Sequence, residues 1–572
     1  MNQPLYRSLR ESFSKDIPHA VTPVVAAPVD VLEVRFAQDL DLLRGNDPPQ
    51  NVIFHISYAM RVMGADGQDL GRLEDAMALC TRTVPILFVD EPRTVVQLRA
   101  YFMENRIRDV MLGAAFRDAY LLKLAARKMP EVRSILDCRE MLYQNPGMDL
   151  RTLPGELVSF GAENVLFWCG ELTRERVHLL QQSFIHVYGF AGAYDAFDAL
   201  SLGLNGIVTD RIAQLYAALE SFPENSFLRR RCLYAHKGFQ YSGKYSENTI
   251  SGVRAAGEYG FDGAEIDVKF TSDFVPVVMH NLNTKGLFDC EPLVTEEVPY
   301  DALKPLRRIG FPEEGIDRFE DLMREMKRFP DTPVVIELKP SEKYHRVEEM
   351  ADQVRQILRS GESQRGALGI MGNLTPGLSY VHEAIPELPL AYVEGGKEVP
   401  PAPADRSEAE ERLYRISGLL SGTAAAYNPE DVNINRLFNE YAKFRGLNVL
   451  VWSRSWTLSP SKWEEHGPDN DRTFLAGYDG WTTDHGDMYL DLPVEIEVPE
   501  DFPETISRDI PVFCTAKMRD GSSRRMQTEV FFIEGGFDMP GPARVMLQLN
   551  CPLHFGDTIH LYSPAFHTVV AN

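Results

Sequence analysis

Three carboxylates and a lysine stand near the ends of two short apolar segments. Glu265 and Asp267 lie two residues apart in AEIDV, and Glu337 lies two residues before Lys339 in PVVIELKP. On a β-strand, residues two apart point to the same face. Carboxylate oxygens from neighbouring strands are hard ligands that suit Mg2+ or Ca2+ better than zinc. Glu265, Asp267 and Glu337 are therefore candidate ligands of a divalent cation, with the positive charge of Lys339 beside them.

Two histidines end short apolar segments of the same region. His236 closes the run in LYAHKG, and His280 closes the run in VPVVMHN. Imidazole titrates near neutral pH, so a histidine can serve as a general acid or a general base. A single histidine in such a place is usually structural, but a pair among carboxylates is a candidate catalytic pair. The sequence leaves open which of the two is the acid.

The elements that must position these residues are strands that alternate with helices. The segment ending in His280 follows AEIDV too closely for a helical crossover, so the two are expected to form a hairpin. The remaining β-branched runs predict a parallel sheet covered on both faces. Eight such strands are predicted, at residues 233–238, 264–268, 333–340, 369–373, 389–393, 424–428, 448–453 and 480–484. Eight parallel strands close a barrel, whose chemistry collects at the C-terminal ends of the strands.

Six motifs, taken in their order along the chain, resemble the glycerophosphodiester phosphodiesterase family, whose members are TIM barrels. The motifs are His-Lys-Gly at 236–238, Glu-Asn-Thr at 247–249, Glu-x-Asp at 265–267, Pro-Val-Val-x-His-Asn at 276–281, Glu-x-Lys at 337–339 and Gly-x-Asp-Gly-x-x-Thr-Asp at 477–484. The resemblance extends over residues 230 to 490. It implies that Glu265, Asp267 and Glu337 are metal ligands. It also implies that His236 and His280 act on opposite sides of the phosphorus.

The resemblance implies a metal-dependent enzyme that cleaves a small-molecule phosphodiester to sn-glycerol 3-phosphate and an alcohol. Hydrolysis of a phosphodiester is mainly a problem of charge, because the non-bridging oxygens are anionic and the leaving alkoxide needs a proton. Lys237, Lys339 and Lys285 are candidate ligands of the phosphate, and Lys285 is the weakest because exposed lysines are common. Asn248 is expected to touch the metal site or to lie in a helix cap. Trp452, at the end of a predicted strand, lines the leaving-group pocket or belongs to the core.

Two residues depart from the family pattern. Lys237 stands where the family usually has arginine, and Asn281 stands where it usually has aspartate. Lysine keeps the positive charge but loses the bidentate geometry that arginine offers a phosphate. Asn281 removes a carboxylate that could orient its neighbours.

Two other functions remain open at this point. The same residues could transfer the phosphoryl group to a hydroxyl instead of water, because the superfamily includes phospholipase D toxins that form cyclic phosphates and agrocinopine synthases that form sugar phosphodiesters. The second alternative is a non-catalytic binding or scaffold protein. Such a protein would have lost its catalytic residues, but the set of histidines, carboxylates and lysine is complete. Since function must be argued from the site, this argues against the second alternative.

Composition excludes several other classes of protein. The chain has 572 residues, long enough for about three or four domains, and a formal net charge of −24, which argues against a nucleic-acid surface. The seven cysteines contain no CxxC pair, so a disulfide framework or zinc site is not expected. The sequence shows no transmembrane run and no signal-peptide core. We expect a cytoplasmic protein, with secretion by a signal-independent route left open and the oligomeric state undetermined.

The first half of the chain repeats the pattern of the second. It contains eight predicted strands, at residues 31–36, 52–57, 85–89, 109–112, 133–137, 164–168, 184–188 and 206–210. GLNGIVTD at 203–210 matches GYDGWTTD at 477–484 in four of eight positions, which indicates an internal repeat. Aligning residues 84–92 with 332–340 puts Val89 where Glu337 stands, so a degenerate barrel without a metal site is predicted.

The fold class expected is thus α/β, with two (β/α)8 barrels in tandem followed by a small all-β domain. The predicted parts are an N-terminal arm at 1–28, the degenerate barrel at 29–222, the catalytic barrel at 230–494 and the accessory β domain at 495–572, with linkers at 221–231 and 499–509. Three roles for the first barrel stay open: to wall the active-site mouth, to select the alcohol, or only to bury apolar surface. The function of the β domain is not indicated.

Overall fold

The computed structural model describes residues 21–571 apart from nine internal gaps or single positions. The gaps are 241–243, 340–346, 360–366, 373–374, 396–398, 421–424, 454–468, 540 and 565, and the side chains of 367–377 and 418 are likewise not described. Residues 1–20, most of the predicted arm, and Pro340 lie outside the described residues. Within the described part, no helix has the length and apolar character needed to cross a membrane.

Residues 232–483 form a closed barrel of eight parallel strands. The strands are β12 (Cys232–Ala235), β13 (Gly263–Phe270), β15 (Val334–Leu338), β16 (Ala367–Gly372), β17 (Leu390–Glu394), β18 (Ala426–Pro429), β19 (Asn448–Trp452) and β20 (Gly480–Thr483). The ring closes because β12 pairs with both β13 and β20. The predicted closed eight-stranded barrel is therefore confirmed, and the strands whose side chains are described are largely buried on both faces, as is usual for parallel strands.

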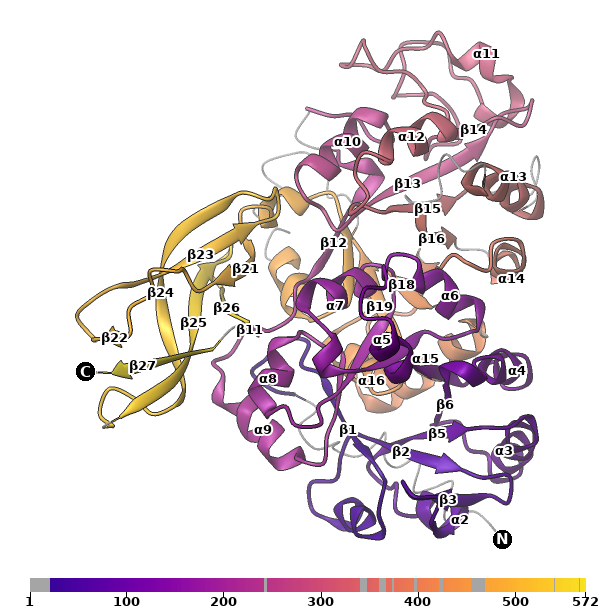
Figure 1. Ribbon diagram of the computed structural model, residues 1–572. Helices are drawn as coiled ribbons and strands as arrows, with labels where there is room; N and C mark the ends of the chain where they lie inside the picture. The colour runs from indigo at the N-terminus through magenta and orange to yellow at the C-terminus, as the bar shows by residue number, and fades with distance from the viewer. Residues whose placement is uncertain are drawn as a thin grey trace.

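An arm rises from this barrel at the predicted hairpin. β14 (Pro276–Val278) pairs antiparallel with β13. Figure 1 shows the arm and the following segment at the top of the view. The helices of this half are α10 (Ile250–Glu258), α11 (Tyr300–Leu303), α12 (Phe319–Met326), α13 (Val347–Arg359), α14 (Thr375–Ala384), α15 (Arg406–Leu420) and α16 (Arg436–Lys443), with 3-10 turns η4 (His236–Gly238), η5 (Thr295–Glu297), η6 (Asp431–Asn433) and η7 (Gly486–Tyr489).

The first half forms a second ring of parallel strands. These are β1 (Val29–Glu33), β2 (Asn51–Ile56), β5 (Val84–Val89), β6 (Met111–Ala115), β7 (Arg133–Asp137), β8 (Asn164–Trp168), β9 (His186–Phe190) and β10 (Gly206–Val208). β1 pairs with both β2 and β10, and β3 (Arg61–Met63) and β4 (Asp69–Arg72) extend β2 antiparallel. The helices are α2 (Leu73–Met77), α3 (Pro92–Asn105), α4 (Tyr120–Lys128), α5 (Arg139–Gln144), α6 (Leu153–Ser159), α7 (Arg174–Gln181), α8 (Ala196–Ser201) and α9 (Ile212–Ser221), with η1 (Ala37–Arg44), η2 (Phe116–Asp118) and η3 (Cys169–Glu171).

The C-terminal strands form a third, mostly antiparallel sheet, drawn in yellow in Figure 1. Its strands are β11 (Ser226–Phe227), β21 (Pro493–Glu497), β22 (Thr505–Ile506), β23 (Val512–Met518), β24 (Ser523–Glu534), β25 (Pro542–Pro552), β26 (Thr558–Tyr562) and β27 (His567–Ala571). Each predicted linker contains a two-residue strand: β11 within 221–231 pairs with β26, and β22 within 499–509 pairs with β27. Strands this short carry little local signal and form only against a neighbour that is distant in sequence.

The two barrels meet through the N-terminal ends of their strands. Asn51, the first residue of β2, donates from its side-chain amide to the carbonyl oxygen of Phe444 at 2.8 Å. Arg133, the first residue of β7, donates to the carbonyl oxygen of Ala425, just before β18, also at 2.8 Å. The C-terminal ends of the two strand sets therefore face away from each other. The first barrel does not wall the mouth of the second, which removes one of its three predicted roles.

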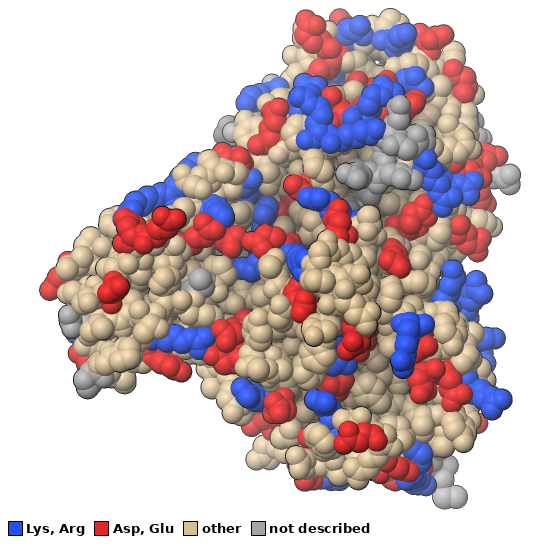
Figure 2. Space-filling model, viewed as in Figure 1, with Lys and Arg blue, Asp and Glu red and all other residues tan. Residues whose placement is uncertain are grey.

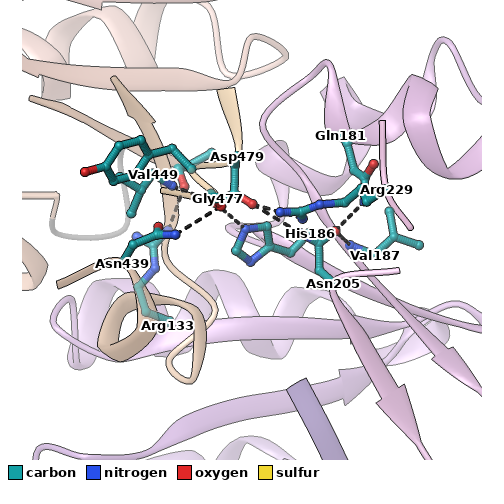
Figure 3. Close-up of polar contacts among 12 residues, drawn as sticks. Arg133, Gln181, His186, Val187, Asn205, Arg229, Asn439, Val449, Gly477 and Asp479 are labelled. Carbon is teal, nitrogen blue, oxygen red and sulfur yellow. Dashed lines mark hydrogen bonds and ion pairs between the residues drawn. The ribbon is translucent and has the colours of Figure 1, made fainter. Parts of the chain in front are cut away.

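The repeated motif lies at the centre of this contact (Figure 3). Asp479 accepts a hydrogen bond from the backbone of Val449 at 2.9 Å, and its repeat partner Asn205 accepts one from Val187 at 3.0 Å. The two side chains also meet, since the Asn205 amide donates to Asp479 at 3.3 Å. Equivalent residues thus anchor equivalent strands and each other across the interface.

Charges are interspersed on the surface. Figure 2 shows acidic and basic side chains mixed over the face in view, in a chain whose formal net charge is −24. Attraction of any anionic ligand would therefore depend on local positive groups and not on the field of the whole molecule.

Candidate active site

The three predicted metal ligands lie together at the C-terminal ends of two adjacent strands. Asp267 of β13 is the register partner of Glu337 of β15, and Glu265 lies two residues before Asp267 on the same face. One carboxylate oxygen from each residue lies within 4.8 Å of those of the other two. Glu265 and Asp267 are buried, and the Glu337 side chain is 14% exposed. The structure thus brings together three oxygen donors from neighbouring strands, as the sequence predicts.

The charge of this cluster suits a cation. Burial, together with the charge of Asp267, raises the pKa of Glu265 to about 8, and burial also raises the pKa of Glu337. Burial acts in the same direction on Asp267, but the positive charges of Lys339 and His280 outweigh it and lower its pKa. One Glu265 oxygen is buried without a hydrogen-bond partner among the described residues. Three carboxylates beside a single lysine offer hard oxygen donors, which fit Mg2+ or Ca2+.

Lys339 lies within this cluster. Its ammonium group is 2.5 Å from a Glu337 oxygen and 3.2 Å from an Asp267 oxygen. Burial lowers the pKa of the ammonium, but these carboxylates outweigh that effect and raise it. Lys339 therefore carries its charge next to the three carboxylates, where a substrate phosphate would meet it.

His236 lies at the start of η4, directly above β12. Its Nδ1 is 2.7 Å from an oxygen of Asp484, and its Nε2 is 3.9 Å from an oxygen of Glu265. Burial lowers the pKa of this imidazole, but the two carboxylates outweigh it and raise the pKa to about 9. Asp484 fixes the ring with Nε2 toward the carboxylate cluster. Sequence reasoning missed Asp484 as a site residue, although it ends the Gly-x-Asp-Gly-x-x-Thr-Asp motif.

Asn248 holds one of the carboxylates in place. Its side-chain amide donates to Asp267 at 2.8 Å, and its carbonyl oxygen accepts from the Asp267 backbone at 2.9 Å. Of the two roles predicted for Asn248, the contact with the carboxylate cluster is present. The helix cap belongs to Thr249, whose hydroxyl accepts from the backbone of Gly252 at 3.1 Å.

Lys237 contributes to the site through its backbone. Its N–H donates to Glu265 at 2.9 Å, and its own φ is +51°. Its ammonium lies 3.1 Å from Glu247, the first residue of the Glu-Asn-Thr motif. Burial lowers the pKa of the ammonium, but Glu247 outweighs this and raises it. The lysine at the position of the family arginine is thus charged and already engaged by a carboxylate.

His280 follows β14, so the hairpin arm positions it. The backbone N–H of Met279, just before it, donates to the carbonyl oxygen of Asp267 at 2.9 Å. The Nδ1 atom of His280 is 3.1 Å from the side-chain oxygen of Asn281, the residue that replaces the family aspartate. Burial lowers the pKa of His280, and the positive charges of Lys237 and Lys339 add to that effect against the opposing charge of Asp267.

Two residues that were predicted to bind the substrate form their contacts away from the carboxylate cluster. Lys285 is exposed, and in the described part of the chain no contact joins its side chain to the carboxylates; its backbone donates to Asn283 at 3.0 Å. Trp452, at the end of β19, is half-buried and donates from its indole to the carbonyl oxygen of Glu394 at 3.2 Å. It stands at the rim of the barrel as predicted, and a pocket role stays a prediction.

Among the described residues, the mouth of the first barrel has no group of carboxylates that could hold a metal ion as Glu265, Asp267 and Glu337 could. Gly206 pairs with Val29 in the first barrel, as its repeat partner Gly480 pairs with Cys232 in the second. From this match, the register of the following strand pairs gives the equivalent positions in the two barrels. Ile53, His55 and Phe88 stand where the second barrel has Glu265, Asp267 and Glu337. The alignment of Val89 with Glu337 was wrong by one residue, because similar runs of apolar letters do not determine ladder register. Neither Phe88 nor Val89 carries a carboxylate, so a metal ligand is missing there in both alignments.

Comparison with known proteins relates the second barrel to a protein family. Residues 236–488 match the model of the glycerophosphoryl diester phosphodiesterase family. The second barrel is a domain of this family. Human glycerophosphocholine phosphodiesterase GPCPD1 is 31% identical over 115 residues, which cover 17% of this chain and 17% of that protein. Mouse glycerophosphodiester phosphodiesterase 1 is 30% identical over 101 residues, covering 16% of this chain and 30% of that one.

The chain thus spans less than a third of the length of these curated relatives. Among solved structures, a phosphodiesterase of Oleispira antarctica in complex with sn-glycerol 3-phosphate is 21% identical, with 45% of this chain and 94% of that chain covered and a TM-score of 0.35. A glycerophosphodiester phosphodiesterase from Parabacteroides distasonis is 20% identical, with 45% of this chain and 94% of that chain covered and a TM-score of 0.32.

Proposed function

We propose that the second barrel is a metal-dependent phosphodiesterase that cleaves glycerophosphodiesters to sn-glycerol 3-phosphate and an alcohol. The observation that carries this proposal is the convergence of Glu265, Asp267 and Glu337, with oxygens within 4.8 Å of one another, beside His236 and Lys339. The matched relatives are phosphodiesterases of glycerophosphodiesters and glycerophosphocholine by name, which supports the substrate class.

Each group has a chemical task in this reaction. A bound Mg2+ or Ca2+ would neutralise the anionic oxygens of the phosphodiester. Lys339 adds a positive charge at the same place. His236 and His280 come from different elements, and we assign them to proton transfer at the attacking water and at the leaving oxygen. The carboxylate of Asp484 holds the His236 ring in one orientation.

The first test is phosphorus NMR of the protein with glycerophosphodiesters, with Mg2+ or Ca2+ and with EDTA. We expect a phosphomonoester signal that EDTA abolishes. A cyclic or exchanged diester would instead show that a hydroxyl replaces water, which is the transferase or lyase alternative. No conversion of any diester in the panel would contradict the proposal.

Glu337→Gln tests the metal assignment. We expect a loss of turnover of at least about 10²-fold, because one of three cation ligands loses its charge. The control is Glu313→Gln, an exposed carboxylate on the segment after the arm. Full activity of Glu337→Gln at saturating metal would remove Glu337 from the site, and matching circular dichroism spectra would show that both variants fold.

A further inference from the structure

A small cavity lies where the two barrels meet the C-terminal sheet. It is lined mainly by apolar and aromatic side chains, by one carboxylate, Glu495 of β21, and by five arginines. These arginines are Arg174, Arg229, Arg230, Arg231 and Arg519. The cavity has a volume of about 30 Å³. On this scale one water occupies about 10–15 Å³, so the space suits a compact ion and not a metabolite.

Two buried carboxylates neutralise some of these arginines. Asp262 lies 2.6 Å from Arg230 and 2.5 Å from Arg519, so a single carboxylate serves two guanidinium groups. Asp479 lies 3.1 Å from Arg229. The Nε atoms of Arg230 and Arg519 are buried and have no hydrogen-bond partner among the described residues. Donors therefore remain free at the cavity after these pairs have formed.

The side chains of the other two arginines form hydrogen bonds only with carbonyl groups among the described residues. Arg231 is 5% exposed and donates to the carbonyl oxygen of Tyr478. Arg174 donates to the carbonyl oxygens of Tyr562 and Leu228. Burial lowers the pKa of Arg231 to about 9. In the described part of the chain, neither guanidinium forms an ion pair with a carboxylate.

The charges around the cavity do not balance. Five arginines face four carboxylates, which are Asp262, Asp479, Glu495 and Glu175, the last two of which act electrostatically on Arg174. Nearby His178 adds no positive charge at neutral pH, because burial and the charge of Arg230 hold its pKa at about 4 although Asp262 lies 2.8 Å away. A buried charge without a counter-charge is strongly unfavourable. The remaining excess of one positive charge therefore favours a bound anion.

We propose that this cavity binds one inorganic oxyanion of the phosphate or sulfate type. Guanidinium groups suit such an ion because their planar donors match its oxygens. The arginines come from three parts of the molecule: α7 of the first barrel, the segment before β12, and the turn after β23. The ion joins these parts, and its site is separate from the carboxylate cluster at the mouth of the second barrel.

Equilibrium dialysis of the full-length protein with labelled phosphate tests the proposal. We expect about one phosphate per chain, displaced by sulfate and not by chloride at equal ionic strength. The active-site variant Lys339→Met should bind the same amount, which separates this site from the mouth. Absence of phosphate and sulfate binding, equal displacement by chloride, or loss of the bound phosphate in Lys339→Met would overturn the proposal.

Variants of the lining arginines identify the site. Arg174→Met and Arg231→Met should each lower phosphate affinity at least about tenfold, whereas Arg524→Met, on exposed β24, should leave it unchanged. If a methionine variant fails to fold, Arg174→Lys keeps the charge and should show weaker binding that is still measurable. Unchanged affinity in the folded variants of Arg174 and Arg231 would contradict the proposal.

Discussion

At the scale of single residues, the site depends on pairs that hold catalytic groups in one orientation. Asp484 lies 248 positions after His236 in the chain, yet the two side chains meet at 2.7 Å. Asn248 binds Asp267 through both its amide and its carbonyl oxygen. Such partners fix the rotamer and the tautomer of the residue that meets the substrate. Both are positioning residues in the proposed mechanism.

Asp484→Asn should lower kcat at least about 10²-fold, because the imidazole of His236 loses the carboxylate that orients it and favours its protonated form. The pH–rate profile should change shape as well, since that carboxylate raises the pKa of His236. The control is Asp491→Asn, whose side chain is 90% exposed. An unchanged kcat and pH profile for Asp484→Asn would exclude this role.

Asn248→Ala and Thr249→Ala form a matched pair of neighbours. The first should weaken metal binding about 10–100-fold, because Asp267 loses its partner. The second should lower the free energy of unfolding by about 1 kcal/mol through the lost helix cap and leave metal affinity intact. Isothermal titration with Mg2+ or Ca2+ and urea unfolding separate the two effects. Equal metal affinities in the two variants would contradict the assignment.

At the scale of elements, the two strand rings end in different mouths. In the first, Glu33 at the end of β1 contacts His55 at 3.0 Å and Arg139 at 3.0 Å, and Arg139 also binds Asp137 at 2.8 Å. The guanidinium of Arg139 lies over the ring of Trp168, 5.1 Å from its centroid. The mouth is therefore closed by its own ion pairs and aromatic contacts. This supports our proposal that the first barrel is non-catalytic.

These ion pairs predict a pH dependence of stability. Burial raises the pKa of Glu33, but His55 and Arg139 outweigh it and lower the pKa from 4.5 to about 2. The folded state thus holds the proton less tightly than the unfolded state does. The resulting stability, about 3 kcal/mol, is present above the unfolded pKa and is lost as the pH falls from about 4.5 to about 2.

Glu33→Gln measures this contribution. Chemical unfolding should show the variant less stable than the wild type at pH 6, with the difference shrinking as the pH approaches 2. A difference that stays constant over that range would mean that the charge of Glu33 is not the cause.

At the scale of the whole molecule, the barrels are joined through the N-terminal ends of their strands. Asp479 is at the centre of this joint, 3.0 Å from His186 and 3.1 Å from Arg229 (Figure 3). Burial raises the pKa of Asp479, but these partners outweigh it and lower the pKa well below its ordinary value. The joint leaves the mouth of the second barrel free of the first. We therefore propose that the first barrel contributes to the stability of the molecule and makes no direct contact with the reacting groups.

Asp479→Asn should destabilise the protein by about 3–5 kcal/mol, because the charge of Arg229 stays buried without its partner. Urea unfolding followed by circular dichroism gives the change. The proposed active site lies at the opposite end of the strands, so kcat of the folded variant should stay near that of the wild type. A urea midpoint equal to that of the wild type would show that the joint does not depend on this ion pair.

The sequence alone was enough for the strands of the second barrel and for most of the polar residues at their ends, but not for Asp484. β-branched runs and the two-residue spacing of Glu265 and Asp267 are local properties, which the chain carries wherever it folds. The tertiary structure decided the rest. Closure of the ring brought Asp484 to His236. The register of the strands made Phe88, and not Val89, the equivalent of Glu337 in the first barrel. β11 formed only against β26. These contacts depend on packing between segments far apart in the chain, which no local pattern records.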